Sequence, residues 1–344
     1  MKYPRPLKQG SKIAITAFSS GVGQACHPRL DIVIKHLTQL GYLVIEGECL
    51  REDIKHVSAS KQLRAQELMR FLCDDTIDAI MPPWGGELAM DILPLLDYEY
   101  LKSVKPKWIM GFSDVSTVLT TLTTKLNWST VHATNLMQLH PKETELLTSS
   151  TLAHLKLKDG DNFEQQPSQF YQIKNDSFSQ NPNVTLNLTE PTLWKILGDK
   201  ETTQFNGRLI GGCFDTISHI IGTEYFDFDA FHHNYIDDGV ILYIENAEMS
   251  PTAFMRALLS LKFKGVFNKV NGLLIGRNAV ITNNGKEISA FEALSNALND
   301  LNIPVIYDAD IGHLPPNMTL FNGAIAEVHF DSKKEIYKLK QKLI

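Results

Sequence analysis

The sequence lacks three features that would indicate a secreted, membrane or nucleic-acid-binding protein. No run of about 18 apolar residues occurs in the chain, and the segment before Lys12 contains no apolar core of a signal peptide. Basic residues are not in excess, because 33 Lys and Arg face 39 Asp and Glu, for a formal net charge of −6. Binding to phosphates requires clustered positive charge. We therefore expect a cytoplasmic protein without a nucleic-acid or membrane partner.

Cysteine is also scarce and irregularly placed. The four cysteines are Cys26, Cys49, Cys73 and Cys213, and no two form a Cys-x-x-Cys pair. Disulfide frameworks use many regularly spaced cysteines, so these four are expected to be reduced, structural thiols. The rest of the composition is that of a globular protein, 43% hydrophobic and 21% charged, and the length favours two domains of about 150 residues each.

The first half of the sequence alternates between strand and helix patterns. Strands are expected over 12–18, 42–47, 77–86 and 108–112, and helices over 30–41, 58–75 and 88–97, with Ser58 as the N-cap of the second helix. Strands alternating with helices at this spacing imply right-handed βαβ units and a parallel sheet. The predicted fold class is α/β, with an N-terminal flavodoxin- or Rossmann-like domain whose functional groups lie at the carboxyl ends of the strands.

The periodic pattern disappears between about 140 and 190, where the sequence is rich in Gln, Asn and Ser. A linker or long surface loop is expected there. Strand and helix patterns then resume, which predicts a smaller C-terminal domain of mixed α/β structure. The expected division is residues 1–160 for the first domain, 161–190 for the linker and 191–344 for the second domain.

The stretch Gly111-Phe112-Ser113-Asp114 separates an apolar strand from a helix. A serine at this point lies at a helix N-terminus, where free N–H groups favour developing negative charge. The position resembles a nucleophile elbow, although the sequence is not Gly-x-Ser-x-Gly. The alternative is that Ser113 or Asp114 only caps the helix.

A nucleophilic serine needs a base and a carboxylate that orients the base. His313 follows a predicted strand and lies between Gly312 and two prolines, so it is the candidate base; alternatively it is a packed loop histidine. Glu245 ends an apolar strand, where a buried carboxylate requires a partner. The alternative for Glu245 is a side chain that reaches solvent.

Two glycine pairs follow or precede regular elements. Gly85-Gly86 could present a backbone N–H to an oxyanion, or could form only a tight turn. Gly211-Gly212 could similarly reflect close packing alone. A different enzyme class is suggested by Asp308, Asp310 and His313, together with His232 and His233, which could bind a metal, although this spacing is weak evidence. A two-domain protein that binds a small molecule without turnover is a third alternative.

Several motifs together resemble a known family. These are Ser58–Met69, the glycines after the third strand, Leu96–Asp114, Asn206–Thr223, Ile241–Glu248, Val270–Arg277 and Asp310–His313. In this order they resemble the S66 serine peptidases, which comprise LD-carboxypeptidases and microcin C immunity-type peptidases. The resemblance covers nearly the whole chain.

The resemblance implies a Ser-Glu-His triad of Ser113, Glu245 and His313, with the backbone amides of Gly86 and Asp114 as the oxyanion hole. The implied reaction is hydrolysis of an amide near a free carboxyl end through an acyl-enzyme, without a metal or organic cofactor. The implied substrate is a muropeptide L,D-tetrapeptide, which links the protein to cell-wall recycling. A peptidyl- or aminoacyl-nucleotide is the alternative substrate, and a homodimer is the implied assembly.

The sequence departs from the family pattern around the expected pocket. It has His132-Ala133-Thr134 in place of His-Gly-Pro, and Cys213 and Phe214 in place of Asn-Leu after the glycine pair. The loop after Glu245 lacks the lysine expected in a dedicated microcin-processing enzyme. The candidate substrate-binding residues are Gly85, His132 and Trp194, of which Trp194 could stack on a nucleobase or could belong to the core.

Overall fold

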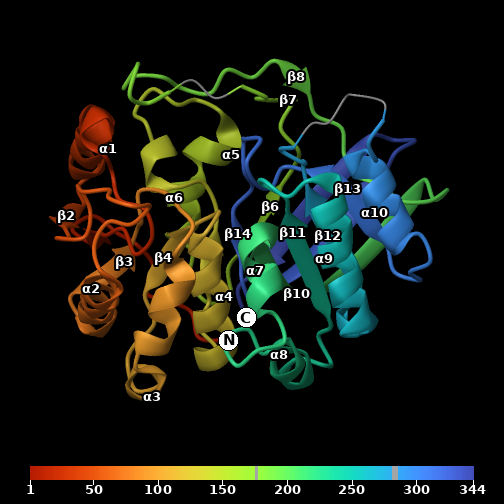
Figure 1. The fold of residues 1–344 in the computed structure, drawn as a ribbon, viewed down its shortest axis with the longest axis horizontal. Coiled ribbons are helices and arrows are strands. Elements are labelled where there is room, and N and C mark those ends of the chain that lie inside the picture. The colour runs from red at the N-terminus through yellow and green to blue at the C-terminus, as the bar shows by residue number, and fades with distance from the viewer. Residues whose placement is uncertain (175–176, 281–285) are drawn as a thin grey trace.

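The computed structural model of the protein describes residues 1–174, 177–280 and 286–344 (Figure 1). Two large sheets lie side by side, each with helices around it, and the two chain ends lie near each other between them. This arrangement confirms the predicted α/β class. Within the described residues, none of the helices combines the length and apolar character needed to cross a bilayer.

The first sheet has six strands in the order β14-β5-β4-β3-β1-β2. Its strands are β1 (Lys12–Ile15), β2 (Leu43–Glu46), β3 (Ile77–Ile80), β4 (Trp108–Gly111), β5 (Val131–His132) and β14 (Leu320–Phe321). All pairs are parallel except β5 with β14. The N-terminal parallel sheet is therefore present as predicted, and it gains an antiparallel edge strand from the C-terminal part of the chain.

The second sheet has eight strands in the order β6-β16-β15-β10-β11-β12-β13-β9. They are β6 (Asn162–Gln165), β9 (Lys195–Ile196), β10 (Thr202–Cys213), β11 (Val240–Glu245), β12 (Gly272–Gly276), β13 (Val305–Ala309), β15 (Ile325–Asp331) and β16 (Ile336–Lys342). Strands β10 to β13 are parallel neighbours, and the flanking pairs are antiparallel. This sheet is the predicted mixed α/β part.

The segment predicted as a linker contains short strands. Besides β6, it includes β7 (Phe170–Tyr171), which pairs with β8 (Glu190–Pro191). Strands β7 and β8 lie together at the top of the view in Figure 1, outside the two large sheets. Because β6 already belongs to the second sheet, the chain crosses between lobes close to the predicted limit of 160. The division into domains at 160 and 190 stays a prediction.

The helices predicted over 30–41 and 58–75 are present with shifted ends, whereas two short helices lie between 146 and 154, where no helix was predicted. The described residues contain ten α-helices. They are α1 (His27–Gln39), α2 (Lys61–Cys73), α3 (Tyr98–Leu101), α4 (Val115–Leu126), α5 (Leu146–Ser149), α6 (Thr151–His154), α7 (Phe214–Ile220), α8 (Phe228–Asn234), α9 (Pro251–Phe263) and α10 (Ala290–Leu298).

Two helix predictions need correction. The N-cap of α2 is Ser60, whose hydroxyl accepts a hydrogen bond from Leu63 N, whereas Ser58 Oγ donates to Ala17 O. The segment 88–97 contains a 3-10 helix over Ala89–Leu95 in place of the predicted helix, and Pro94, which has no N–H to donate, lies inside it.

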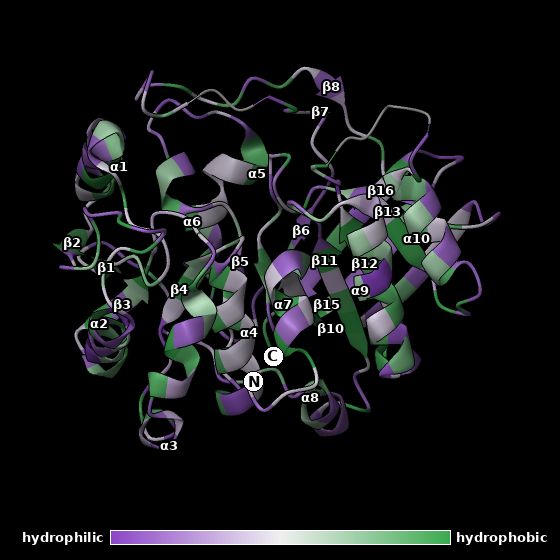
Figure 2. Ribbon diagram, in the orientation of Figure 1, coloured by the Kyte–Doolittle hydropathy of each residue, from purple (hydrophilic) through white to green (hydrophobic). Residues whose placement is uncertain are grey.

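Helix α4 lies between the two sheets and joins the lobes. Ten of its twelve residues are buried, although many are threonines and serines. The hydroxyls of Thr120, Thr121 and Thr124 donate to carbonyls of the preceding turn. Those of Thr117 and Thr123 bond to Asp114 and Thr130 instead, so each of these hydroxyls has a partner. Figure 2 shows the contrast with α2 and α8, which are largely hydrophilic on the visible side. The helix that follows Ser113 is therefore an element of the lobe interface.

The glycines before α7 allow this close packing. A Cβ on Gly212 would lie 2.5 Å from Ser116 Oγ of α4, and the Cys213 N–H donates to the same oxygen at 3.0 Å. The interpretation of Gly211-Gly212 as a close-packing pair is therefore confirmed.

Candidate active site

Ser113 lies in a sharp turn between β4 and α4. Its φ is +64°, a left-handed conformation that a residue with a Cβ adopts at a cost of about 1–2 kcal/mol. A Cβ on Gly85 would lie 2.7 Å from Ser113 Cβ and 2.7 Å from Asp114 N. The loop after β3 can therefore approach the serine only because residue 85 is glycine. The turn holds the hydroxyl at the carboxyl end of the sheet.

Asp114 occupies the N-cap position of α4 but makes no side-chain capping bond to the helix backbone. Its carboxylate accepts hydrogen bonds from Ser19 Oγ at 2.6 Å, Ala89 N at 2.7 Å and Thr117 Oγ1 at 3.0 Å. The side chain is 1% exposed. Asp114 thus links the loops after β1 and β3 to the serine turn, rather than capping the helix in the usual way.

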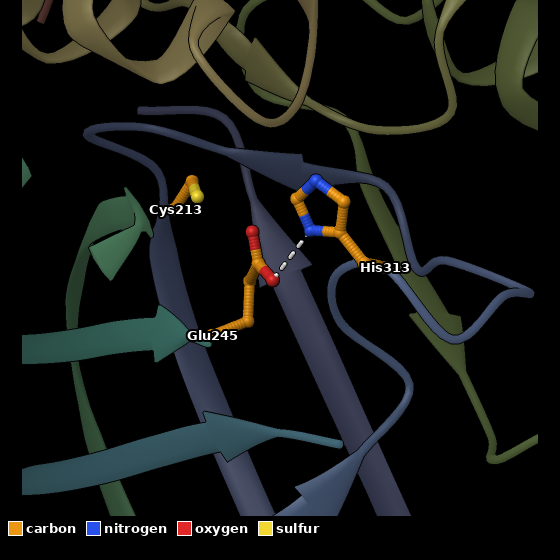
Figure 3. A group of neighbouring side chains, drawn as sticks. All are labelled: Cys213, Glu245 and His313. Atoms are coloured by element: carbon orange, nitrogen blue, oxygen red, sulfur yellow. Dashed lines mark hydrogen bonds and ion pairs between the residues drawn. The ribbon is translucent and has the colours of Figure 1, made fainter. Parts of the chain in front are cut away.

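A chain of hydrogen bonds connects Ser113, His313 and Glu245. His313 Nε2 lies 3.0 Å from Ser113 Oγ, and His313 Nδ1 lies 2.9 Å from Glu245 Oε2. Glu245 ends β11, and His313 lies on the loop after β13, where Figure 3 shows its ring above the carboxylate. The carboxylate is fully buried, whereas 27% of the histidine side chain is exposed. The structure therefore joins side chains from both lobes.

The charges of this pair stabilise each other. Burial disfavours the imidazolium, but the attraction and hydrogen bond of Glu245 outweigh burial and raise the pKa of His313. Burial also disfavours the carboxylate, but the attraction and hydrogen bond of His313 leave the pKa of Glu245 lowered. Glu245 is thus held ionised, which suits a group that orients the Nδ1–H and stabilises the protonated ring.

Two backbone N–H groups beside Ser113 have no acceptor among the protein groups that the structure describes. Within the described parts of the chain, neither Gly86 N nor Asp114 N donates to a protein group. Gly86 has a φ of +144°, and a Cβ there would lie 2.5 Å from Ser20 Oγ. These donors are where sequence reasoning placed the oxyanion hole, which stays a proposal.

Two cavities of unequal size meet at Ser113 and His313. The larger cavity, of about 590 Å³, has aromatic walls formed by Trp84, Phe112 and Phe178, and Gly85 also lines it. The smaller cavity, of about 240 Å³, is bordered by Cys213, Asp215, Glu248 and other residues of the second lobe. A substrate bond positioned at Ser113 therefore has the larger cavity on one side and the smaller cavity on the other.

The structure does not place His132 in either cavity. Its ring is fully buried and lies edge-on to Tyr243, with ring centroids 5.2 Å apart. Burial lowers the pKa of His132 to about 4, so the ring is neutral. His132 is the register partner of Gly111 on β4, which puts it behind the serine turn. His132 lines neither cavity, so its position gives no support for the expected contact with substrate.

Trp194 likewise belongs to the core. Its indole is 1% exposed, and its Nε1–H donates to Asp310 Oδ2 at 2.8 Å. The rings that face the larger cavity are those of Trp84, Phe112 and Phe178. The expected stacking role of Trp194 is therefore not met by its position, and sequence reasoning missed the residues that do line the wall.

The residues of the metal-dependent alternative are not grouped together. Asp310 forms a buried ion pair with Arg277, and Asp308 pairs with Lys195 at 2.9 Å. His232 and His233 lie at the end of α8. Among the described residues, the one group of three potential ligands is instead Cys213, Glu245 and His313.

Two further residues organise the site and carry no signal in the sequence. Buried Arg29 donates from Nε to Met137 O and from Nη1 to Pro182 O and Val184 O, and its guanidinium lies 4.5 Å from the Phe178 ring centroid. Arg29 thereby holds residues 177–186, the covering segment, against the larger cavity. Asp215 accepts hydrogen bonds from the N–H groups of residues 247–249 and fixes the loop after Glu245.

A serine, a histidine and a glutamate bonded in this order on two α/β lobes form the arrangement of serine hydrolases. Comparison with known families shows that residues 13–133 match the LD-carboxypeptidase N-terminal domain and residues 206–328 match the LD-carboxypeptidase C-terminal domain of the S66 peptidases. The chain belongs to the S66 peptidase family, and the resemblance predicted from the sequence motifs is confirmed.

Individual relatives match over nearly their full lengths. A Vibrio cholerae protein named "Putative carboxypeptidase" is 26% identical, over 100% of this chain and 99% of its own. The microcin C7 self-immunity protein MccF of Escherichia coli is 25% identical, over 95% and 93%. The solved structure of MccF in complex with aspartyl sulfamoyl adenosine shares the fold, with a TM-score of 0.83, 23% identity and 98% of each chain covered.

Proposed function

We propose that this protein is a serine carboxypeptidase that hydrolyses an amide near a free carboxyl end. The observation that carries the proposal is the chain of hydrogen bonds from Ser113 Oγ through His313 to Glu245, at 3.0 and 2.9 Å. Both distances are within the range for proton transfer between a nucleophile and its base. Membership of the S66 family supports this chemistry.

The proposed reaction proceeds through an acyl-enzyme. Neutral His313 accepts the Ser113 proton as Oγ attacks the carbonyl carbon, and Glu245 stabilises the imidazolium that forms. The N–H groups of Gly86 and Asp114 donate to the oxyanion. His313 then gives its proton to the leaving amine, and the same residues activate water to release the acyl group.

The unequal cavities support removal of a terminal residue. An amide bond at Ser113 extends into a space of about 590 Å³ on one side and about 240 Å³ on the other. A small leaving group fits the second space, whereas cleavage in the middle of a long peptide requires room on both sides. We therefore infer that one terminal residue is removed. We propose a muropeptide L,D-tetrapeptide as the substrate, because the matching family models are those of LD-carboxypeptidases.

Incubation with an L,D-tetrapeptide tests this function. Mass spectrometry of the products is expected to show loss of the terminal residue by the wild-type protein and no loss by Ser113→Ala. Activity that survives in Ser113→Ala and is abolished by a chelator would instead support a metal-dependent hydrolase. Binding of the tetrapeptide without turnover by the wild-type protein would support a ligand-binding protein.

A peptidyl- or aminoacyl-nucleotide is the second candidate substrate. The specific observation in its favour is the aromatic wall of the larger cavity, formed by Trp84, Phe112 and Phe178, because flat rings stack on nucleobases. Parallel incubation with an aminoacyl-sulfamoyl-adenosine separates the two substrates, since each assay reports a different product.

We further propose that the protein acts in the cytoplasm as a homodimer, in the recycling of cell-wall peptides. The family resemblance supports the assembly and the pathway. Light scattering is expected to give twice the mass of 38.7 kDa. A monomeric mass at the concentration of the activity assay would refute the dimer without affecting the chemistry.

A further inference from the structure

Cys213 lies directly beside the carboxylate of the proposed triad. It ends β10 as Glu245 ends β11, and the two residues are register partners in the parallel pair. Figure 3 shows the Cys213 sulfur on the side of the carboxylate away from His313. The sulfur, a carboxylate oxygen and a ring nitrogen of His313 all lie within 4.8 Å of one another. The thiol is therefore part of one cluster with two members of the triad.

The cluster has the chemistry of a zinc site. Thiolate, carboxylate and imidazole are the ligands that Zn²⁺ prefers, and the usual bond lengths place tetrahedral ligand atoms roughly 3.3–3.6 Å apart. The ligand atoms, which lie within 4.8 Å of one another, therefore need to approach each other by at most roughly 1–1.5 Å to bind the ion. Glu245 Oε1 is buried and has no hydrogen bond of normal geometry among the described residues. The Cys213 thiol interacts only weakly with the carboxylate, so Oε1 retains lone pairs for a cation.

An ion can reach this cluster from the smaller cavity. Cys213 and His313 both border that space, as does Ser113. Asp215 is close to the sulfur, with Oδ2 at 3.7 Å, but its two oxygens accept the backbone N–H groups of the loop after Glu245. It therefore supports the site from outside rather than supplying a ligand.

We propose that Zn²⁺ binds Cys213, Glu245 and His313 as an inhibitory ion that blocks the use of His313 as a base. The inhibition rests on the proposed peptidase function, whereas the binding does not. This role is opposite to that of a catalytic metal, because the loaded protein is the inactive one.

The mechanism of inhibition follows from the two ring nitrogens. Coordination through Nδ1 replaces the proton that Nδ1 donates to Glu245, and the neutral ring then carries its proton on Nε2. An Nε2–H faces Ser113 as a donor and cannot accept the serine proton. The thiol proton of Cys213 leaves to solvent, so the neutral site releases one proton for each ion bound.

Soft cations are favoured over hard ones. The cluster offers one sulfur beside one nitrogen and one carboxylate oxygen, a ligand set that suits a cation that forms strong bonds to sulfur. Mg²⁺ and Ca²⁺ prefer oxygen ligands and are not expected to compete.

Direct binding tests the site without any substrate. Titration of Zn²⁺ against a chromogenic chelator is expected to show one ion per chain for the wild-type protein and for Ser113→Ala. Cys213→Ala is expected to bind at least about tenfold more weakly, since loss of an outer-shell partner alone costs about 10–100-fold. Cys73→Ser, which removes a thiol at the end of α2, is the matched control and is expected to bind as the wild type does. Equal binding by wild type and Cys213→Ala would overturn the proposal.

Cobalt provides a signature that a structural effect of the substitution cannot imitate. Co²⁺ bound to the wild-type protein is expected to show a thiolate-to-cobalt charge-transfer band, which Cys213→Ala lacks and Cys73→Ser retains. A cobalt spectrum without this band in the wild-type protein would show that Cys213 is not a ligand, and would overturn the proposal.

Activity completes the test. Zn²⁺ is expected to inhibit tetrapeptide hydrolysis by the wild-type protein, and a chelator is expected to restore the activity. Each inhibition constant is measured against the uninhibited rate of the same protein. The constant of Cys213→Ala is expected to be about tenfold or more higher than that of the wild type. Equal inhibition of both proteins would refute the inhibitory role. If neither substrate is cleaved, the proposed function fails while the binding and cobalt experiments still decide whether the site exists.

Discussion

The two lobes hold their parts of the proposed triad in different ways. Ser113 is fixed by backbone: a φ of +64° in a turn between two regular elements, with Gly85 pressed against it. Glu245 and His313 are fixed by each other, through a 2.9 Å hydrogen bond that closes only when β11 and the loop after β13 are in place. Gly312 permits this contact, because a Cβ there would collide with the Glu245 carboxylate. The nucleophile therefore depends on local geometry and the base on tertiary contacts.

This difference explains which parts of the site could be predicted from the sequence. The serine turn has a local signal, since an apolar strand, a stop and a helix follow one another within residues 105–126. The pairing of Glu245 with His313 has none, because 68 residues separate them. The residue patterns gave His313 and Glu245 only as separate candidates with open alternatives. The family resemblance implied that they act together, and the structure places them in hydrogen-bond contact.

The largest expected effect removes the nucleophile. Ser113→Ala is expected to lower kcat by at least about 10⁴-fold, because residual catalysis by the oxyanion donors alone is small. Steady-state kinetics with the L,D-tetrapeptide measure the loss, and thermal unfolding by circular dichroism shows whether the fold is retained. A folded variant with near-normal kcat would refute the serine mechanism.

The second largest expected effect tests whether tertiary contacts fix the base. Glu245→Gln is expected to lower kcat by about 10³–10⁴-fold, because the amide no longer stabilises the imidazolium or enforces its tautomer. It also removes the attraction that raises the pKa of His313. Since the neutral ring is the base, activity falls as the pH decreases through that pKa, and the acid limb of the variant is expected at lower pH than that of the wild type.

The pH profile of kcat/KM, recorded with chelator present, measures this shift. In the wild-type protein the acid limb is expected above about 6.5, the ordinary pKa of histidine. An unchanged limb in Glu245→Gln would show that another group controls the protonation of the base.

A smaller expected effect tests whether local backbone geometry fixes the nucleophile. Gly85→Ala is expected to lower kcat by about 10²-fold, a loss similar to that of one oxyanion donor. The added Cβ would lie 2.7 Å from Asp114 N. It must therefore displace either the loop after β3, which carries Gly86 N, or the turn that carries Ser113. Gly23→Ala is the matched control, because its Cβ would meet nothing within 4 Å. Equal kcat for both variants would show that the turn tolerates movement.

The errors of the sequence analysis have the same physical origin as its success. Trp194 and Asp310 were candidates for a stacking ring and a metal ligand, yet they bond to each other across 116 residues and are both buried. A polar group is buried only where a partner bonds to it, and the partner is often distant in the sequence. Asp310 also pairs with Arg277, and the order of residues along the chain does not reveal such a pair. Strand β14 was missed because two residues show no periodicity.

The smallest effect concerns the cover of the larger cavity. Phe178→Ala removes a ring that borders the cavity and stacks on Arg29. Contacts this far from the serine act on the ground state and the transition state alike, so KM is expected to rise with kcat unchanged. With an aminoacyl-sulfamoyl-adenosine the rise is expected to reach about fivefold or more, since loss of one stacked base costs about 1–3 kcal/mol. With the tetrapeptide it is expected to stay near the wild-type value.

Phe263→Ala is the control for this variant, because that ring is 83% exposed at the end of α9, outside both cavities. Parallel measurement of KM for both substrates then decides what the cavity wall recognises. An equal rise for the two substrates would mean that Phe178 maintains the position of the covering segment through Arg29, and that the wall does not distinguish a base from a peptide. A rise confined to the nucleotide, the expected result, would show that the Phe178 ring stacks on a base when one is bound. The parallel incubation, and not this variant, decides which of the two substrates is turned over.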